Sequence, residues 1–254
     1  MLRLVRYNHD LLRGYWAMEL TRTGLRLKSG RYRKRGVAMK LYIDPITVNC
    51  RKVVAGLDLI GADYEEERLS YFGGDHKQAA YTAINPNAEL PALVDGDMKL
   101  WESNAILVYA AEKMQNGEAY PPDPKVRADI TRWLLWESSK WFEACYVYLV
   151  ENVVKPMLDN TPDKAILDAH APMFHARAAV LEASLVDRQW LSAGHPTIAD
   201  IAIASPMHLH GVQKLPLVDY PNILGWIARV EALPCWQKSD PVPHIPPELL
   251  AKVG

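Results

Sequence analysis

The residues best suited to bind a charged ligand are Glu102 and Ser103, which precede an apolar helical pattern that includes Ile106, Val108 and Tyr109. An acid and a hydroxyl at a helix start lie beside backbone N–H groups that have no helical partner. Those N–H groups can bind a carboxylate, and Glu102 can pair with an ammonium. A ligand end that carries both charges is an α-amino acid. The alternative is structural: Ser103 caps the helix, and Glu102 favours its dipole.

A regular order of short elements must position this helix start. Two apolar runs, 92–94 and 98–101, flank the dipeptide Asp95-Gly96, which is typical of tight hairpins. Upstream, the patterns predict a strand at 39–43, a helix at 48–59, an exposed or edge strand at 64–69 and a short helix at 75–83. The order βαβαββα predicts an α/β domain of the thioredoxin-like type, with a right-handed crossover.

The length of 254 residues allows two domains. We expect the thioredoxin-like domain at 39–115, a linker with Gly and Pro at 116–123, and an all-α helical bundle at 124–233. A proline-rich tail, 234–254, is expected to run over the surface as extended chain. Residues 1–38 carry ten Lys/Arg against two acids, and we expect a poorly ordered basic extension there.

Composition and charge exclude several classes of function. The formal net charge is −1, so the +8 of residues 1–38 leaves −9 on the remainder, and an acidic body gives no support for a nucleic-acid partner. No apolar run is long enough to span a bilayer, so we expect no membrane partner. The three cysteines, Cys50, Cys145 and Cys235, are widely spaced and predict neither a disulfide scaffold nor a metal site. A cytoplasmic location is the expectation.

The second domain has helical periodicity throughout, with one long or kinked helix expected at 125–158 and another at 164–186. Trp133, Trp136 and Trp141 fall within one stripe of the first helix. An aromatic stripe of this kind either lines a pocket for an apolar ligand or belongs to the core or to a subunit interface.

A capping signal lies further along this domain. Thr197 is a good N-cap residue, and Asp200 three residues later can return the hydrogen bond as a short capping box. The predicted role of both residues is structural.

The motifs of the first domain resemble those of cytosolic glutathione S-transferases over roughly residues 39–240. The matching stretches are Asn85-Pro86, Leu90-Pro91-Ala92-Leu93, the hairpin and Glu102-Ser103. The resemblance implies that glutathione is the co-substrate. It implies that Pro91 is cis and exposes the backbone of Leu90 to the cysteinyl residue of glutathione. Glu102 and Ser103 would hold the γ-glutamyl head.

The turn before the first helix, 45–51, resembles the Pro-x-Ser-x-x-Cys-Arg turn of theta- and delta-like members, including bacterial ones, with Thr47 replacing the catalytic serine. A thiol of pKa near 8.5 is only about 3% ionised at pH 7. One hydrogen bond to a charged sulfur contributes about 1.5–3 kcal/mol, enough to activate it. Thr47 is therefore the expected catalytic residue, and Asn49 is a second candidate donor. The alternatives are that Thr47 only caps the helix and that Cys50 is a small buried hydrophobe.

The glycyl end of the site matches less well. His76 precedes Asn85 by nine residues, as does a glycyl-carboxylate-binding histidine in theta-like members, and Lys77 is adjacent. The alternative for His76 is a solvated side chain. Glu89 is expected to contact glutathione although the position is often basic or an amide, and Asn104 replaces an arginine found in some classes.

We therefore expect a homodimeric glutathione S-transferase whose thiolate attacks a hydrophobic electrophile or a peroxide, with detoxification as its role. A non-catalytic binding protein of the same fold is one alternative. A specialised dehalogenase, isomerase or lyase is another. His208-Leu209-His210 lacks the ligand set of a metal site, so no metal is expected.

Overall fold

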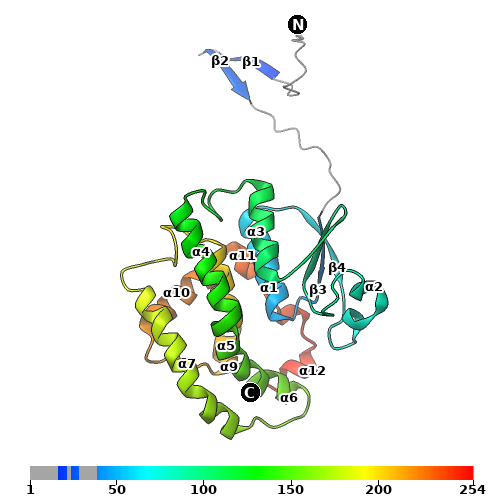
Figure 1. Cartoon of the computed structure of the whole chain (residues 1–254), viewed down its shortest axis with the longest axis vertical. Helices are drawn as coiled ribbons and strands as arrows, with labels where there is room; N and C mark the ends of the chain where they lie inside the picture. Colours follow the sequence, from blue (N-terminus) through cyan, green and yellow to red (C-terminus); the bar gives the residue numbers. More distant parts are fainter. Residues whose placement is uncertain (1–16, 22–23, 29–38, 254) are drawn as a thin grey trace. The chain divides into compact units, whose positions relative to one another are not determined.

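The computed structural model describes residues 17–21, 24–28 and 39–253 (Figure 1). The chain divides into two units, 1–37 and 38–254. In the first, strands β1 (Ala17–Thr21) and β2 (Gly24–Lys28) form an antiparallel pair. The rest of the predicted basic extension lies outside the described residues, so its poor order stays a prediction.

The second unit contains a mixed four-stranded sheet in the order β4-β3-β5-β6. Strand β3 (Met39–Ile43) pairs in parallel with β4 (Tyr64–Arg68) and antiparallel with β5 (Ala92–Asp95), which pairs with β6 (Met98–Trp101). Strand β4 lies at an edge, as its acidic residues predicted. Gly96 has φ +63°, the left-handed conformation that the tight turn between β5 and β6 requires.

Helices α1 (Val48–Ile60) and α3 (Ser103–Met114) lie on one side of this sheet, and turn η1 (Asp75–Lys77) and α2 (Ala79–Thr82) lie on the other (Figure 1). Helices α1 and α3 approach closely at Gly56, where an added Cβ would lie 2.3 Å from Cδ2 of Leu107. The predicted order βαβαββα is confirmed.

The remainder of the chain is built from helices. The run 124–157 is continuous: α4 (Pro124–Trp136), α5 (Phe142–Leu149) and α6 (Lys155–Met157) are joined by two wider π turns, η2 (Glu137–Trp141) and η3 (Val150–Val154). There follow α7 (Lys164–Ser184), α8 (Ile198–Ala204), turn η4 (Ser205–Met207), α9 (His210–Gln213) and α10 (Pro221–Glu231). The predicted all-helical second domain is confirmed.

Helix α8 begins with the predicted capping box. The backbone N–H and the hydroxyl of Thr197 both donate to Oδ2 of Asp200, at 2.9 and 3.1 Å. Oδ1 of Asp200 accepts from the backbone N–H of Leu191 and from Nε1–H of Trp226, each at 3.0 Å. Asp200 therefore joins three segments beneath a helix whose residues are all buried.

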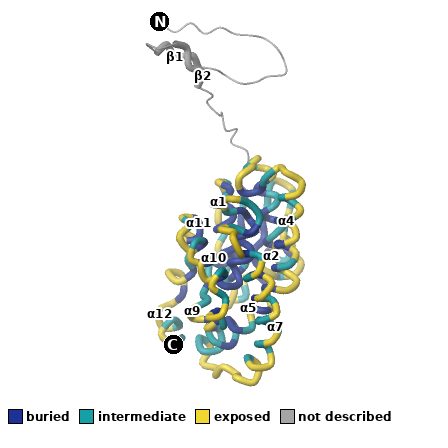
Figure 2. The backbone as a smooth tube through the Cα atoms, turned by 90° about the vertical axis from the view of Figure 1, so that its left-hand side faces the viewer, coloured by how far each residue is buried: buried dark blue, intermediate teal, exposed yellow. Residues whose placement is uncertain are grey.

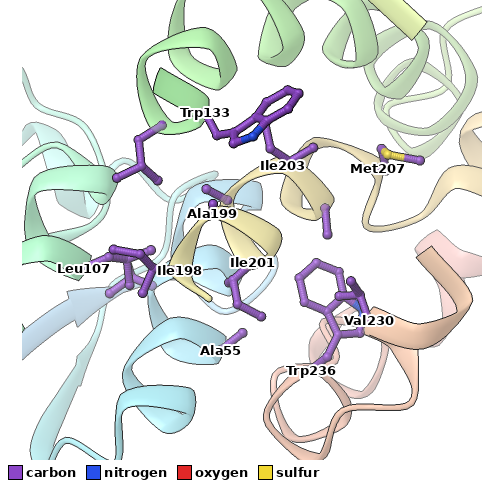
Figure 3. Packing of buried hydrophobic residues seen from close by; sticks show 14 of the residues in the cluster. Ala55, Leu107, Trp133, Ile198, Ala199, Ile201, Ile203, Met207, Val230 and Trp236 are labelled. Atoms are coloured by element: carbon purple, nitrogen blue, oxygen red, sulfur yellow. The ribbon is translucent and has the colours of Figure 1, made fainter. Parts of the chain in front are cut away.

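One hydrophobic core extends from the sheet into the helical domain. In Figure 3, Leu107 of α3 lies beside Ile198 of α8, Ala55 of α1 lies beside Ile201, and Trp133 of α4 lies beside Ile203. Figure 2 shows these buried positions as a dark blue interior, with the exposed positions along the outer faces of the helices.

A second, smaller apolar cluster contains Val48, Leu149 and Val153. Half-buried side chains pack against it: Phe142, Val154, Met157, Leu209 and Val253. Its first member is the residue after Thr47.

The prediction of an extended tail at 234–254 is wrong. This segment forms α11 (Pro234–Lys238), turn η5 (Val242–His244) and α12 (Pro247–Leu250), each with a proline in its first turn, where the missing N–H costs nothing. Trp236 is buried, and Cζ of the Arg51 guanidinium lies 4.2 Å from the centre of its ring. The backbone carbonyl of Trp236 accepts a hydrogen bond from Nη2 of Arg51 at 3.3 Å. Apolar burial and this contact hold the tail against α1.

Candidate active site

Thr47 occupies the N-cap position of α1 in an extended conformation, with φ −90° and ψ 144°. Its hydroxyl donates a 3.0 Å hydrogen bond to the carbonyl of Asp44 and caps none of the described backbone N–H groups. The side chain is half-buried. The interpretation of Thr47 as a side-chain helix cap is therefore wrong.

The turn that carries Thr47 is held by Asp44, a residue that we did not predict as part of the site. Its buried carboxylate accepts from the N–H of Ile46 at 3.2 Å and from the N–H of Tyr71 at 2.8 Å. The second bond joins the end of β3 to the loop after β4. Asp44 thus fixes both the turn before α1 and the loop that leads to His76.

Cys50 lies one helical turn beyond Thr47 and is fully buried. Burial raises the pKa of its thiol to about 12, against a smaller lowering by the Thr47 hydroxyl. A thiol that stays protonated at neutral pH is not a nucleophile, which confirms the prediction that Cys50 packs as a small hydrophobe. Asn49 is half-buried, and its Oδ1 has no hydrogen-bond partner among the described residues. Its role as a donor stays a prediction.

The peptide bond between Leu90 and Pro91 is cis, as the resemblance implied. The carbonyl of the preceding Glu89 accepts from the hydroxyl of Tyr81 at 2.5 Å and from Nδ2 of Asn85 at 2.7 Å. Within the described ranges, no hydrogen bond uses the N–H or the C=O of Leu90. The backbone of Leu90 is therefore supported from behind and has no hydrogen-bond partner among the described residues, while the residue as a whole is 8% exposed.

Glu102 has φ +71° and ψ 109°, a conformation that costs a residue with a side chain about 1–3 kcal/mol. Its carboxylate side chain is exposed. Ser103 is the first residue of α3, and its hydroxyl is buried and accepts from Nζ of Lys52 at 3.0 Å rather than capping a described N–H group. The interpretation of Ser103 as a cap is wrong.

Thr47 and Ser103 lie at the starts of α1 and α3, two helices that pack against each other at Gly56 and Leu107. Lys52, five residues after Thr47 in α1, donates a hydrogen bond to the Ser103 hydroxyl at 3.0 Å.

His76 is buried, so the alternative of a solvated histidine is wrong. Its ring stacks on Tyr71, with centroids 4.5 Å apart and planes 8° from parallel. Its Nδ1 has no hydrogen-bond partner in the part of the chain that the structure describes. Lys77 and Glu89 are exposed, and only the backbone of Glu89 takes part in the described hydrogen bonds.

Of the two alternatives for the tryptophan stripe, burial in the core fits Trp133 and Trp141, which are 1% and 0% exposed. Half-buried Trp136 stacks on Trp141 at 5.6 Å and packs edge-on against Trp133 at 5.4 Å. Nε1 of Trp141 donates to the carbonyl of Ile203 at 3.0 Å. Trp133 and Trp141 belong to the main hydrophobic core and Trp136 packs against it, so the stripe is part of the core.

Three further residues of the site were missed: Lys52, Glu137 and Tyr71. Lys52 lies on the buried face of α1, one turn after Val48 and one turn before Gly56. A lysine on an otherwise apolar helix face is the sequence feature that could have indicated a buried charge. Its partner Glu137 is 85 positions away, which no local pattern reveals.

Within the described ranges, no group of three His, Cys, Asp or Glu side chains could hold a metal ion. His208 is buried, and His210 contacts Glu231. Among the helices of those same ranges, each is too short or too polar to cross a membrane.

The fold and the site agree with comparisons to known proteins. The sequence profile described as "Glutathione S-transferase, N-terminal domain" matches residues 37–112, and "Glutathione S-transferase, C-terminal domain" matches 142–234. The probable glutathione S-transferase GSTF2 of Oryza sativa subsp. japonica is 31% identical over 203 residues, 79% of this chain and 94% of that protein. Glutathione S-transferase 3 of Zea mays is 31% identical over 213 residues, which are 82% of this chain and 96% of that protein.

Solved structures support the same class. Glutathione S-transferase I from maize, in complex with an atrazine glutathione conjugate, has 27% identity and a TM-score of 0.73 and covers 80% of this chain and 97% of its own. A theta-class enzyme from Xanthomonas axonopodis pv. citri, with glutathione bound, has 27% identity and a TM-score of 0.72, with 80% and 97% covered.

This chain belongs to the glutathione S-transferase family. The relatives confirm the predicted class of enzyme, a transferase that uses glutathione as co-substrate.

Proposed function

We propose that glutathione binds along a line from Ser103 through Leu90 to Thr47. The observation that carries this proposal is the unpaired backbone of Leu90 beside the cis bond to Pro91. The γ-glutamyl head would lie at the start of α3, where Ser103 and the free N–H groups take its carboxylate and Glu102 takes its ammonium. The cysteinyl residue would pair with Leu90.

The role of Thr47 is to stabilise the thiolate. Lowering a thiol pKa from about 8.5 to about 6.5 needs roughly 2.7 kcal/mol, and one hydrogen bond to a charged atom contributes about 1.5–3. The hydroxyl reaches the sulfur by rotating about its Cβ–Oγ bond, away from the Asp44 carbonyl that it contacts at 3.0 Å. Rotation of the proton leaves χ1 unchanged, so the stiffness of threonine is no obstacle. Asn49 is the second candidate donor.

The glycyl carboxylate would meet the exposed ammonium of Lys77, and His76 supports this end through its stack on Tyr71. Glu89 would act through its backbone carbonyl, which is held by Tyr81 and Asn85 and supports Leu90. Its exposed carboxylate would repel a ligand carboxylate.

The electrophile would lie against the second apolar cluster rather than against Trp133, Trp136 or Trp141. Val48, which follows Thr47, packs there with Leu149 and Val153. The thiolate sulfur then forms a bond to an electrophilic carbon, and the displaced group leaves with its bonding electrons. With a peroxide, the sulfur attacks one oxygen and the other leaves with the electron pair.

We further infer a cytoplasmic homodimer that acts in detoxification, with the catalytic turn of theta- and delta-like members. Light scattering should give twice the mass of one chain.

A non-catalytic binding protein is the second candidate, favoured by one observation: the hydroxyl of Thr47 already donates to Asp44. Titration calorimetry with glutathione and turnover of a chlorinated aromatic substrate separate the candidates. Binding with turnover supports the enzyme, and binding without turnover of any electrophile or peroxide in a panel supports the binder. No binding at millimolar glutathione contradicts both. A specialised dehalogenase, isomerase or lyase would appear in the same panel as selective turnover.

A further inference from the structure

Lys52 is a buried lysine at the centre of the site, with 2% exposure. Its Nζ lies 3.0 Å from Oγ of Ser103 and 2.8 Å from Oε2 of Glu137. It projects from α1 of the sheet domain, and Glu137 begins the π turn η2 of the helical domain. One ammonium therefore joins the proposed ligand-binding hydroxyl to the opposite domain.

Glu137 is 0% exposed and is held through Oε2, while its Oε1 has no hydrogen-bond partner among the described residues. The same Oε2 accepts from Nδ2 of Asn104 at 2.9 Å, and that amide also donates to the carbonyl of Leu134 at 2.9 Å. Burying a charged pair is costly unless both members keep good partners. Apolar side chains of similar size would fill this position at lower cost, so stability alone does not explain the pair.

The contact with Lys52 sets the direction of the Ser103 hydroxyl. An ammonium donates hydrogen bonds and accepts none, whereas a hydroxyl has one proton and two acceptor lone pairs. Ser103 must therefore be the acceptor in this contact, and its proton remains available. Among the described residues, no acceptor takes that proton.

We infer that Lys52 is a positioning residue that aims the Ser103 hydroxyl at the α-carboxylate of the γ-glutamyl head and supplies positive charge beneath it. This inference rests on the proposed binding mode of glutathione. Glu137 balances the charge when the site is empty. Without Lys52, the Glu137 carboxylate would lie close behind Ser103 and repel the ligand carboxylate.

Two ligands test this inference: glutathione and 4-aminobutyryl-cysteinyl-glycine, which lacks only the α-carboxylate. Calorimetry gives the dissociation constant of each. The wild type should bind glutathione at least tenfold more tightly than the analogue, because a hydrogen bond to a charged group contributes that much. Equal binding of the two by the wild type would contradict the proposed binding mode itself.

The double variant Lys52→Met/Glu137→Gln removes both buried charges together. It should bind glutathione about tenfold more weakly and the analogue within twofold of the wild type. If this variant is folded and still discriminates tenfold, the inference is wrong while the proposed binding mode stands. The matched control is Lys40→Met/Glu67→Gln, which removes an exposed pair of 2.8 Å on the sheet and should change neither constant.

The single variant Glu137→Gln provides a test if the double variant fails to fold. It retains Lys52 and the contact with Asn104 while removing the opposing charge. This variant should bind glutathione at least as tightly as the wild type does. It should still bind the analogue at least tenfold more weakly than glutathione. A purely structural role predicts instead that both ligands weaken equally, and that result would overturn the inference.

Discussion

The side-chain amide of Asn85 lies 2.7 Å from the carbonyl of Glu89 and supports the backbone just before the cis bond. Asn85 is 2% exposed. Its Oδ1 also accepts from the N–H and Nδ2 of Asn87. The proposed pairing of glutathione with Leu90 thus depends on a side chain that never touches the ligand.

Asn85→Ala should therefore weaken glutathione binding severalfold and lower the free energy of unfolding by about 1–3 kcal/mol, because buried partners lose their hydrogen bonds. Calorimetry and urea unfolding measure the two effects. Asn87→Ala is the control, since Asn87 is exposed and should lose less than 1 kcal/mol. Equal effects of the two variants would contradict a special role for Asn85.

Thr47→Ala should lower kcat/KM by about 10- to 100-fold, because the thiolate loses a charged hydrogen bond. Thiolate increases with pH, so a higher thiol pKa moves the rise in activity of Thr47→Ala to higher pH. Thr47→Ser keeps the hydroxyl and should keep the wild-type profile. An unchanged profile in Thr47→Ala would exclude Thr47 as the donor and favour the parallel variant Asn49→Ala.

Cys50 should make stability depend on alkaline pH. Its thiol, raised by burial to a pKa of about 12, stays protonated in the folded chain while the unfolded thiol ionises from about pH 9. The unfolded state then binds fewer protons, so the free energy of unfolding falls by about 1.4 kcal/mol per pH unit between these values. Cys50→Ala should show a shallower decline in urea unfolding at pH 8, 9 and 10. A slope identical to the wild type would contradict this origin.

Thr197→Ala should cost about 1–2 kcal/mol of unfolding free energy, because the start of α8 loses its cap. Asp200→Ala should cost more, since donors from Leu191, Thr197 and Trp226 are then buried without an acceptor. The control is Asp163→Ala, which removes an exposed cap of α7 and should cost about 1 kcal/mol or less. Thermal unfolding ranks the three, and a larger loss for Asp163→Ala would contradict the central role of Asp200.

Gly56→Ala should destabilise the fold by about 1–3 kcal/mol, because the new Cβ overlaps Leu107. Gly225→Ala is the matched control within a helix. There the nearest atom is Nη1 of Arg229 at 3.6 Å, an ordinary contact, so this variant should gain about 0.5–1 kcal/mol from helix propensity. Stabilisation by both variants would show that α1 and α3 can move apart.

The sequence predicted the elements of the sheet domain well, because Asp95-Gly96, the alternating strands and the start of α3 depend on nearby residues. It also predicted the capping box of Thr197 and Asp200 for the same reason. The burial of the tryptophans was left open, since a helical stripe does not say what covers it. The pairing of Lys52 with Glu137 and the docking of Trp236 on Arg51 join distant segments, and only the fold brings them together.

The division of the Lys52–Glu137 pair between two domains has a consequence for recombination. A chimaera that joins one family member's first half to another's second half near 116–123 would inherit the cation from one parent and the carboxylate from the other. Parents that place these charges differently would leave a lone ion at the junction. Domain exchange intended to change electrophile preference would then also disturb the recognition of glutathione.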